Sequence, residues 1–391
     1  MQILFLTHVL PLPLDAGPKI RAHYVLRHLA ESGHEVTLVS LIRPTERQTD
    51  VQALARFCRS VESVPITRSR LKDVLDGLAS LLSGQPFLIR RDQFPALDLR
   101  VQRLLEGRTF DAVHADQLWM ASCAVRCTSG LLRVLDQHNA VFRVPERLSA
   151  NQTNPVVRAL LRREAAKLFR YECATLERFD RVVWVSEDDR AAFPPLGPSP
   201  RRESVIPIGV DPSVNTRVER KRPFRVTFVG GIHWPPNAEA VRWFARRVWP
   251  LVASAVPDCV FTVIGKGSPT GLGHASRMVV TGYVSDPRAY LEETAAFVVP
   301  LLTGAGMRVK ILDAWCWAIP VVSTRIGAEG LAYTDGQDIL IGDEPAAFAE
   351  HVIRILRDHR EARRIGENGR ATVEARYDWR KIYAAWDDVY R

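Results

Sequence analysis

The stretch GAGMRVKILDAWCWAIPVVST, residues 304–324, joins a glycine loop, a helical pattern and a short β-branched run. The apolar run AFVVPL, residues 296–301, comes just before it. Continuous apolar runs, unlike alternating ones, are typical of strands that are buried on both faces of a parallel sheet. A strand, a loop, a helix and a second strand in this order therefore predict one βαβ unit of a helix-covered sheet.

The same alternation of apolar runs and helical patterns extends in both directions from this unit. A first series begins at ILFLT, residues 3–7, and ends at SVIPIG, residues 204–209. A second series begins at RVTFVGG, residues 225–231, after a polar break at 211–223. We therefore predict an α/β fold of two facing Rossmann-like, doubly wound domains with a ligand cleft between them. The expected bounds are 1–212 for the N-terminal domain, 222–375 for the C-terminal domain and 376–391 for a last helix that packs back on the N-terminal domain.

The composition is that of a globular protein with an excess of basic residues. The 391 residues are 47% hydrophobic and 25% charged, and the net charge is +9. Such a charge favours an anionic partner, which is a nucleic acid, a membrane surface or a phosphorylated ligand. We expect no nucleic-acid partner, because the chain carries no aromatic and basic platform and no recognition motif.

The cysteines and the apolar runs indicate the cellular compartment in which we expect the protein. The six cysteines are scattered, and the spacing of Cys123 and Cys127 fits no common zinc pattern. We expect reduced core thiols in a cytoplasmic protein. The start MQILFLT has the pattern of a buried strand rather than a signal peptide. No apolar run reaches the roughly 18 residues that a membrane span needs.

The glycine loop and the helix after it carry a candidate anion site. Gly304 and Gly306 allow a ligand to approach the backbone closely. Arg308 and Lys310 open the helix, where cations are unfavourable unless an anion binds there. Asp313, about one turn further, can accept hydrogen bonds from ribose hydroxyls. The set predicts a nucleoside diphosphate site, and the alternative is a surface helix with scattered charges.

A second loop of similar character follows the first apolar run. Gly17 lies in the stretch LPLDAGPKIRAH, and Lys19 and Arg21 open the next helical pattern. A helix N-terminus with two cations predicts a second contact to phosphate. The alternative is a capped helix with solvated cations.

These two loops and several other motifs resemble the family 4 retaining glycosyltransferases, which have the GT-B fold. The motifs include DAGPKIR (15–21), DAVHAD (111–116), VTFVGGIHWPPN (226–237) and, most specifically, the stretch 306–331. The resemblance covers nearly the whole chain. It implies transfer of a sugar, as by a hexosyltransferase, from a nucleotide-sugar donor to a hydroxyl or similar acceptor in polysaccharide or glycoconjugate synthesis. It implies an acceptor-side N-terminal domain and a donor-binding C-terminal domain. It also implies no cofactor and no metal, and the chain lacks an Asp-x-Asp motif.

The resemblance also assigns roles to residues of the donor site. Asp313 matches an acidic residue that holds the ribose, and Arg308 and Lys310 hold the diphosphate and neutralise its charge as it leaves. Tyr283 and Val284 match a loop that borders the nucleobase. The other matched donor-binding positions are Gly17, Gly231, Gly304, Ala305, Gly306 and Met307.

The resemblance also points to three residues of the N-terminal domain, one as a catalytic contact to the donor sugar and two on the acceptor side. His138 follows the apolar run RVLDQ and matches a histidine near the donor sugar, although a lone histidine there is often structural. His114 and Asp116 fall where acceptor contacts are expected. No protein base is needed if the leaving phosphate takes the proton of the acceptor.

The chain departs from the family pattern in three places, one of which is Ile208, where Asn is usual. Ala305 stands where the first of two glutamates is usual, and the usual Arg and Lys after the run 225–231 are absent. Arg308 and Lys310 are expected to replace those cations. Asn237, in the altered segment, is predicted to be a helix N-cap rather than a ligand residue.

The stretch 154–172 is helical and basic, and its two glutamates, Glu164 and Glu172, dilute the charge. A basic amphipathic helix can lie on an anionic membrane, which implies a peripheral protein at the inner face of the membrane and a lipid-linked acceptor. An ordinary surface helix leaves a soluble glycan or small molecule as the acceptor. Both interpretations stay open.

Two other functions are compatible with the same fold. A sugar-nucleotide epimerase needs carboxylates near the sugar for proton transfer, and the loop 304–307 has none. A non-catalytic module that binds nucleotide sugars needs no such group, and Ala305 leaves this alternative open.

Overall fold

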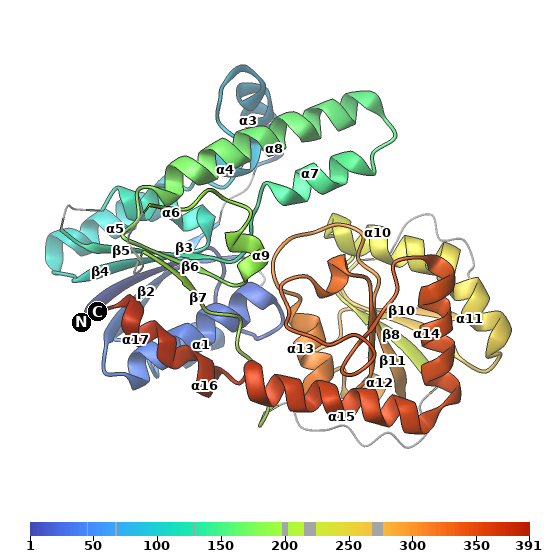
Figure 1. The fold of residues 1–391 in the computed structure, drawn as a ribbon. Helices are drawn as coiled ribbons and strands as arrows, with labels where there is room; N and C mark the ends of the chain where they lie inside the picture. The colour runs from blue at the N-terminus through green and yellow to red at the C-terminus, as the bar shows by residue number, and fades with distance from the viewer. Residues whose placement is uncertain (45, 67–68, 128–129, 198–201, 215–223, 268–276) are drawn as a thin grey trace. The chain divides into compact units, whose positions relative to one another are not determined.

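The computed structural model describes residues 1–44, 46–66, 69–127, 130–197, 202–214, 224–267 and 277–391 (Figure 1). These residues form two compact units. The first comprises Met1–Gly209, Ala305–Met307 and Trp379–Arg391, and the second comprises Val210–Gly304 and Arg308–Asp378. Most of the predicted polar break at 211–223, and the predicted start of the second domain at residue 222, lie outside the described residues.

The first unit contains a parallel sheet of seven strands in the order β3-β2-β1-β4-β5-β6-β7. The strand order reverses between β1 and β4, so this is a doubly wound sheet with its switch point there. The strands are β1 Gln2–Thr7, β2 Glu35–Ile42, β3 Ser60–Pro65, β4 Ala112–Asp116, β5 Leu132–Gln137, β6 Arg181–Trp184 and β7 Glu203–Val205.

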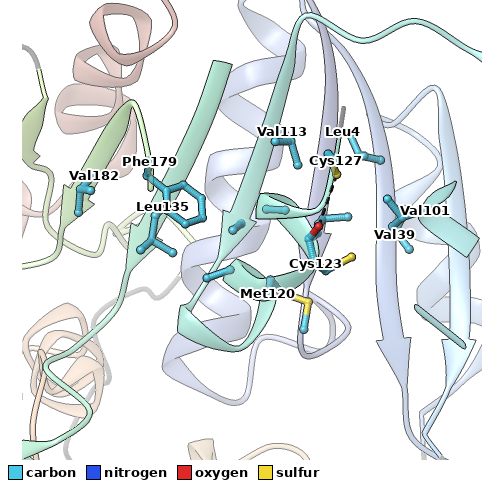
Figure 2. Close-up of a cluster of buried hydrophobic side chains, with 14 of the residues drawn as sticks. Leu4, Val39, Val101, Val113, Met120, Cys123, Cys127, Leu135, Phe179 and Val182 are labelled. Atoms are coloured by element: carbon cyan, nitrogen blue, oxygen red, sulfur yellow. Dashed lines mark hydrogen bonds between the residues drawn. The ribbon is translucent and has the colours of Figure 1, made fainter. Parts of the chain in front are cut away.

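Helices cover this sheet, and the core lies between helices and strands. Figure 2 shows α6 laid over the strands, with Met120 and Cys123 facing Leu4, Val113 and Leu135. The helices are α1 Gly17–Glu31, α2 Gln48–Leu54, α3 Arg70–Leu82, α4 Phe87–Arg91, α5 Pro95–Gly107, α6 Leu118–Val125, α7 Arg143–Ala150, α8 Pro155–Leu176 and α9 Glu187–Arg190.

The second unit contains a parallel sheet of six strands in the order β10-β9-β8-β11-β12-β13. The prediction of an α/β fold with two doubly wound parallel sheets is therefore confirmed. That a ligand cleft separates the two stays a prediction. The strands are β8 Arg225–Val229, β9 Val260–Ile264, β10 Met278–Gly282, β11 Thr294–Val299, β12 Val321–Ser323 and β13 Leu340–Ile341.

An aromatic cluster fills the space between this second sheet and its helices. The rings of Phe244 and Phe261 lie 4.6 Å apart, and Trp249 and Phe348 pack against Phe244. Each such buried ring contributes roughly 1.5–3 kcal/mol through the hydrophobic effect. The helices are α10 Pro235–Trp243, the π-helix η1 Phe244–Val248, α11 Trp249–Ala255, α12 Arg288–Glu292, α13 Val309–Cys316, the 3-10 helix η2 Ile326–Ala328, α14 Pro345–Arg357 and α15 His359–Arg376.

The last residues of the chain belong to the first unit and form three short helices: α16 Trp379–Ile382, the 3-10 helix η3 Tyr383–Ala385 and α17 Trp386–Val389. The ring of Trp379 stacks on Tyr24 of α1 at 5.2 Å. The Tyr383 hydroxyl accepts a hydrogen bond from the backbone N–H of Gly209 at 3.0 Å. A Cβ on Gly209 would lie 2.7 Å from the Trp379 Cβ, so only glycine permits this approach.

All six cysteines are described and none forms a disulfide. Five are buried, and Cys173 is half-buried. Burial raises the pKa of the Cys58 thiol to about 12, so this group stays protonated and unreactive at neutral pH. The prediction of reduced thiols in the core is in line with this placement.

Candidate active site

The glycine loop lies between the end of β11 and the start of α13. Gly304 has a φ of +132°, and a Cβ added there would lie 2.6 Å from Nη2 of Arg308. Gly304 therefore allows the Arg308 guanidinium to fold back against the loop. Gly306 also has a positive φ, of +76°. Arg308 is the N-cap residue of α13, one position before the predicted first turn, and its side chain is buried.

Lys310, in the first turn of α13, reaches the loop that follows β8. Its Nζ donates a hydrogen bond to Oδ1 of Asn237 at 3.1 Å and lies 4.3 Å from the centre of the Phe228 ring. Nδ2 of Asn237 in turn donates to the carbonyl of Gly231 at 2.9 Å. Asn237 thus ties together the predicted donor residues Gly231 and Lys310, which are far apart in sequence.

The prediction that Asn237 is a helix N-cap is wrong. Helix α10 begins at Pro235, with Trp234 as its N-cap residue, and Asn237 lies inside the first turn with its side chain buried. Proline is common at the first helical position because its missing N–H has no partner to lose there. Pro235 is therefore a signal in the sequence that places the start of the helix three residues earlier than an N-cap at Asn237 would.

The charges of α13 are strongly perturbed. Burial, and then the neighbouring Arg308 cation, lower the pKa of Lys310 to about 7. Burial raises the pKa of Asp313 to about 7. Among the described residues no carboxylate lies within ion-pair distance of Lys310. A bound phosphate would supply that missing countercharge and restore the charge of the ammonium.

The structure leaves two predicted donor residues apart from this group. Tyr283 and Val284 follow β10, the edge strand of the second sheet. The Tyr283 side chain is 60% exposed, which leaves its ring available for stacking. No contact of the described residues joins this pair to Arg308, Lys310 or Asp313, and its nucleobase role stays a prediction.

A buried polar group lies at the carboxyl ends of β4 and β5 in the first unit. Nε2 of His138 lies 3.0 Å from Oδ1 of Asp116 and 3.4 Å from Oδ2 of Asp136. Nε2 of His114 lies 4.0 Å from the same Oδ2 of Asp136. The structure thus brings together His138, predicted to contact the donor sugar, and His114 and Asp116, predicted on the acceptor side, and adds Asp136 as their neighbour.

The buried charges decide the protonation of these histidines. Burial alone would lower the pKa of His138, but the carboxylates of Asp116 and Asp136 outweigh it and raise that pKa to about 9. His138 is therefore an imidazolium at pH 7 and can donate a hydrogen bond to an anion but cannot accept a proton. Burial lowers the pKa of His114 to about 3, so this ring is neutral.

Arg21 binds the Asp136 carboxylate of this polar group and does not point to a phosphate site. Its Nε and Nη2 donate to the Asp136 carboxylate at 2.8–2.9 Å, and its Nη1 donates to the carbonyls of Ile206 and Pro207. Both side chains are fully buried. The prediction that Arg21 adds charge for a ligand at the helix N-terminus is wrong, because Asp136 already neutralises it.

Lys19 also lies close to carboxylates of the first unit. Its Nζ lies 3.2 Å from the Asp15 carboxylate and 3.6 Å from that of Glu46. Gly17, two residues earlier, is the first residue of α1 and precedes Pro18. No described contact brings Gly17 to His138, so its role beside a phosphate stays a prediction.

Glu172 of α8 is a buried residue that supports this polar group, which its sequence pattern did not predict. Its carboxyl accepts hydrogen bonds from the backbone N–H groups of Val141 and Phe142 and from Nε2 of Gln137, each at 2.9 Å. Burial raises its pKa to about 8. Glu172 therefore holds the turn that carries His138, and it is not the surface charge that the helical pattern suggested. The sequence pattern does not distinguish Glu172 from Glu164, the other glutamate of this basic helix.

Three side chains of the first unit have the composition of a metal site. Ligand atoms of His114, Asp116 and Asp136 lie within 4.8 Å of one another. However, both Asp136 oxygens already accept hydrogen bonds from Arg21, and the His138 imidazolium lies against Asp116. Two cations beside the same carboxylates leave no excess of negative charge to hold a divalent ion.

Two residues of the C-terminal segment contact side chains of this polar group. Nδ1 of His114 lies 2.6 Å from the hydroxyl of Tyr390, and the His114 ring stacks on Phe5 at 4.0 Å. The Trp386 ring lies 5.4 Å from the Arg21 guanidinium. The last turn of the chain thus fixes the orientation of two of the buried side chains.

Changing Tyr390 to Phe tests this link. We expect the free energy of unfolding to fall by about 1–3 kcal/mol, because the buried Nδ1 of His114 loses its partner. Thermal unfolding of the variant measures the loss. Tyr283→Phe is the matched control, since the exposed Tyr283 hydroxyl can exchange its partner for water. Equal melting temperatures for the wild type and Tyr390→Phe would contradict the assignment.

Comparison with known proteins places this arrangement in a family. The model of Glycosyltransferase Family 4 matches residues 17–214, and the model of Glycosyl transferases group 1 matches residues 223–358. The chain is 22% identical over 402 residues to an uncharacterized 44.6 kDa protein in the cps region of Klebsiella pneumoniae, with 96% of each chain covered. It is 24% identical over 400 residues to the MMP alpha-(1->4)-mannosyltransferase of Mycolicibacterium hassiacum, with 96% of this chain and 94% of that protein covered.

A similar fold occurs in Alr3699/HepE of Anabaena, whose crystal structure is in complex with UDP-glucose. The TM-score is 0.69 at 15% identity, over 99% of this chain and 98% of the other. At this identity the likeness concerns the fold alone, and the two family models carry the assignment. The chain therefore belongs to glycosyltransferase family 4 and is a transferase of the GT-B fold.

Proposed function

We propose that this enzyme transfers a sugar from a nucleotide-diphosphate-sugar donor to an acceptor hydroxyl, with retention at the anomeric carbon and without a metal. The observation that carries the proposal is the pair Arg308 and Lys310 at the start of α13, with Asn237 tying Lys310 to the loop after β8. The names of two similar proteins, a mannosyltransferase and a protein in complex with UDP-glucose, support the donor class.

The donor is held by the second unit in this proposal. Arg308 and Lys310 bind the diphosphate, and the backbone of 304–307 faces the sugar. Asp313 accepts hydrogen bonds from the ribose, and Tyr283 with Val284 borders the base. The two cations stabilise the charge that develops on the leaving diphosphate, which is the task that a metal ion performs in metal-dependent transferases. We therefore propose that no cofactor is required.

The residues of the first unit have supporting roles in the same step. His138 is cationic at neutral pH and donates a hydrogen bond to the donor, and Asp116, which is fully buried beside it, holds the imidazolium in place on the acceptor side. The complete burial of His114 favours a positioning role through Asp136 over direct contact. Because His138 holds its proton up to a pH of about 9, the leaving phosphate and not this histidine takes the proton of the acceptor.

A turnover assay tests the reaction class. The enzyme is incubated in EDTA with a panel of nucleotide sugars and with acceptors of three kinds: glycans, lipid-linked sugars and small hydroxyl compounds of the cytoplasm. We expect release of one nucleoside diphosphate and an NMR spectrum that shows the anomeric configuration of the donor in the product. An inverted product or complete loss of activity in EDTA would contradict the mechanism. An isomerised donor without release of a nucleoside diphosphate would identify an epimerase. Binding of the nucleotide sugar without any turnover would identify a non-catalytic module.

The pKa of Lys310 makes a further prediction about donor binding. A bound diphosphate raises this pKa above its value of about 7 in the free protein, so binding takes up a proton when the pH exceeds 7. We expect the dissociation constant of the nucleoside diphosphate to rise by up to about tenfold per pH unit above 7, and to change little below it. Isothermal titration in buffers of different ionisation enthalpy measures both the affinity and the proton uptake.

Two variants assign this pH dependence to Lys310. Lys310→Arg keeps the positive charge at every pH and is expected to abolish the rise of the dissociation constant above pH 7. Asp313→Asn is expected to keep it, which separates the effect from the ionisation of Asp313 at a similar pH. An unchanged slope in Lys310→Arg would show that another group titrates.

A further inference from the structure

Helix α3 turns its apolar face outward. Six large apolar side chains recur along it at helical spacing and are between 43% and 92% exposed: Leu71, Val74, Leu75, Leu78, Leu81 and Leu82. The polar Ser80 of the same helix is buried instead. An amphipathic helix in a globular protein normally buries its apolar stripe, and a large exposed one marks a binding surface.

The basic helix α8 extends this apolar surface. Val156, Val157 and Leu160 in its first two turns are 39–66% exposed. Positions 156, 160, 163 and 167 fall on one side of a helix, because they are spaced by three or four residues. A shallow depression on that side is lined by Pro155, Val156, Ala159, Leu160 and Arg163. We call the exposed apolar side chains of both helices the α3–α8 surface.

Two cations of α8 hold α3 in place. Nη2 of Arg163 donates to the carbonyl of Leu81 at 2.7 Å, and the buried Nζ of Lys167 donates to the carbonyl of Ser80 and, at 3.1 Å, to its hydroxyl. Cations at the last carbonyls of a helix also stabilise its dipole. Figure 1 shows α3 next to α8, and these hydrogen bonds join the C-terminal turn of α3 to α8, so the α3–α8 surface belongs to two helices in contact.

The charges around this surface are mostly positive. Arg70 and Lys72 on α3 and Arg162 and Arg170 on α8 are exposed. The acidic side chains of both helices are, apart from Asp73, engaged by the protein itself. Asp76 pairs with Lys72 and Arg90, Glu164 accepts from the N–H of Leu88, and Glu172 is buried against the turn after β5.

We propose that the α3–α8 surface docks on an anionic lipid bilayer, with its leucines among the acyl chains and its arginines at the headgroups. An apolar face flanked by basic side chains is what a protein needs to lie in a membrane interface. No helix in the described part of the chain is long and apolar enough to cross a membrane, so the contact is peripheral. The docked enzyme would meet a lipid-linked acceptor without a membrane anchor.

Co-sedimentation of the full chain with vesicles tests the proposal. We expect binding to vesicles of phosphatidylcholine mixed with phosphatidylglycerol, at least tenfold weaker binding to phosphatidylcholine alone, and a decrease with added salt. The double variant Leu75→Ser/Leu82→Ser and the double variant Arg162→Gln/Arg170→Gln are each expected to weaken binding at least tenfold.

Matched controls carry the same changes elsewhere. Leu99→Ser on α5 and Leu251→Ser on α11 alter exposed leucines outside the α3–α8 surface, and Arg325→Gln with Arg363→Gln removes two exposed cations of the second unit. These controls are expected to bind vesicles as the wild type does. All targeted side chains are exposed, and the thermal unfolding of each variant verifies that it folds.

Two results would overturn the proposal. One is a wild type that leaves anionic vesicles unbound, or serine variants that bind them as well as the wild type does. The other is a wild type that forms dimers which Leu75→Ser/Leu82→Ser dissociates, with no vesicle binding, because a second copy then covers the surface. Neither result affects the transferase proposal, which is tested separately by nucleotide binding to the same variants.

Discussion

Changing Asp136 to Asn is expected to destabilise the first unit by about 3–5 kcal/mol, because it leaves the Arg21 guanidinium buried without a countercharge. The pair is fully buried and is joined by hydrogen bonds of 2.8–2.9 Å. For a domain of this size the loss corresponds to a decrease of about 6–20 °C in melting temperature. Differential scanning calorimetry, which resolves the two units if they unfold separately, measures it.

The same change is expected to lower the pKa of His138. Without Asp136 the histidine keeps only Asp116 as an anionic neighbour, so its pKa falls from about 9 toward its ordinary value. The matched control is Glu31→Gln, which breaks the exposed pair of Glu31 with Arg27 on α1. An exposed pair contributes little, so this control should change stability by less than about 0.5 kcal/mol. Equal melting temperatures for Asp136→Asn and Glu31→Gln would contradict the role of the buried pair.

Changing Arg308 to Gln is expected to lower kcat/KM by about 10²–10³-fold, or roughly 2.7–4 kcal/mol of transition-state stabilisation. The physical reason is that the charge on the diphosphate increases as the bond to the sugar breaks, and Arg308 is fixed at the N-terminus of α13 to meet it. Part of the loss should appear in the affinity for the nucleoside diphosphate. Steady-state kinetics and isothermal titration of the variant separate the two contributions.

Arg325→Gln is the control for this experiment. Arg325 is an exposed arginine of the second unit that pairs with Asp343, and its loss should leave kcat/KM unchanged. Arg308→Lys should recover part of the activity, because it restores the charge without the two-pronged geometry of a guanidinium. A kcat/KM of Arg308→Gln within a factor of two of the wild type would remove Arg308 from the mechanism.

The strands could be predicted from the sequence because burial on both faces leaves a local signature. Runs such as 225–231 and 296–301 are continuous and β-branched, and they form β8 and β11 of the second sheet. The glycine loop at 304–306 could be predicted for a similar reason, since its conformation depends on residues within a few positions. The resemblance to a known family then supplied roles that spacing alone does not indicate.

The errors concern polar residues whose partners are distant in sequence. Arg21 pairs with Asp136, 115 positions away, and Glu172 holds a turn more than 30 positions before it. On their own helices both have the pattern of solvated charges, because a pattern of one helix does not show which face a distant loop will cover. Helix α3 shows the same limit in reverse, since its leucines recur at the spacing of a core stripe and yet lie exposed.

The most direct test of the account is the thermal stability of the enzyme with nucleoside diphosphates of each base, in the presence and absence of EDTA. A ligand at about 100 times its dissociation constant stabilises the folded protein by about 2.7 kcal/mol, which a melting curve resolves. The account predicts a shift with one base family that EDTA leaves intact and that Arg308→Gln reduces. A shift that EDTA abolishes, or one that Arg308→Gln retains in full, would contradict it.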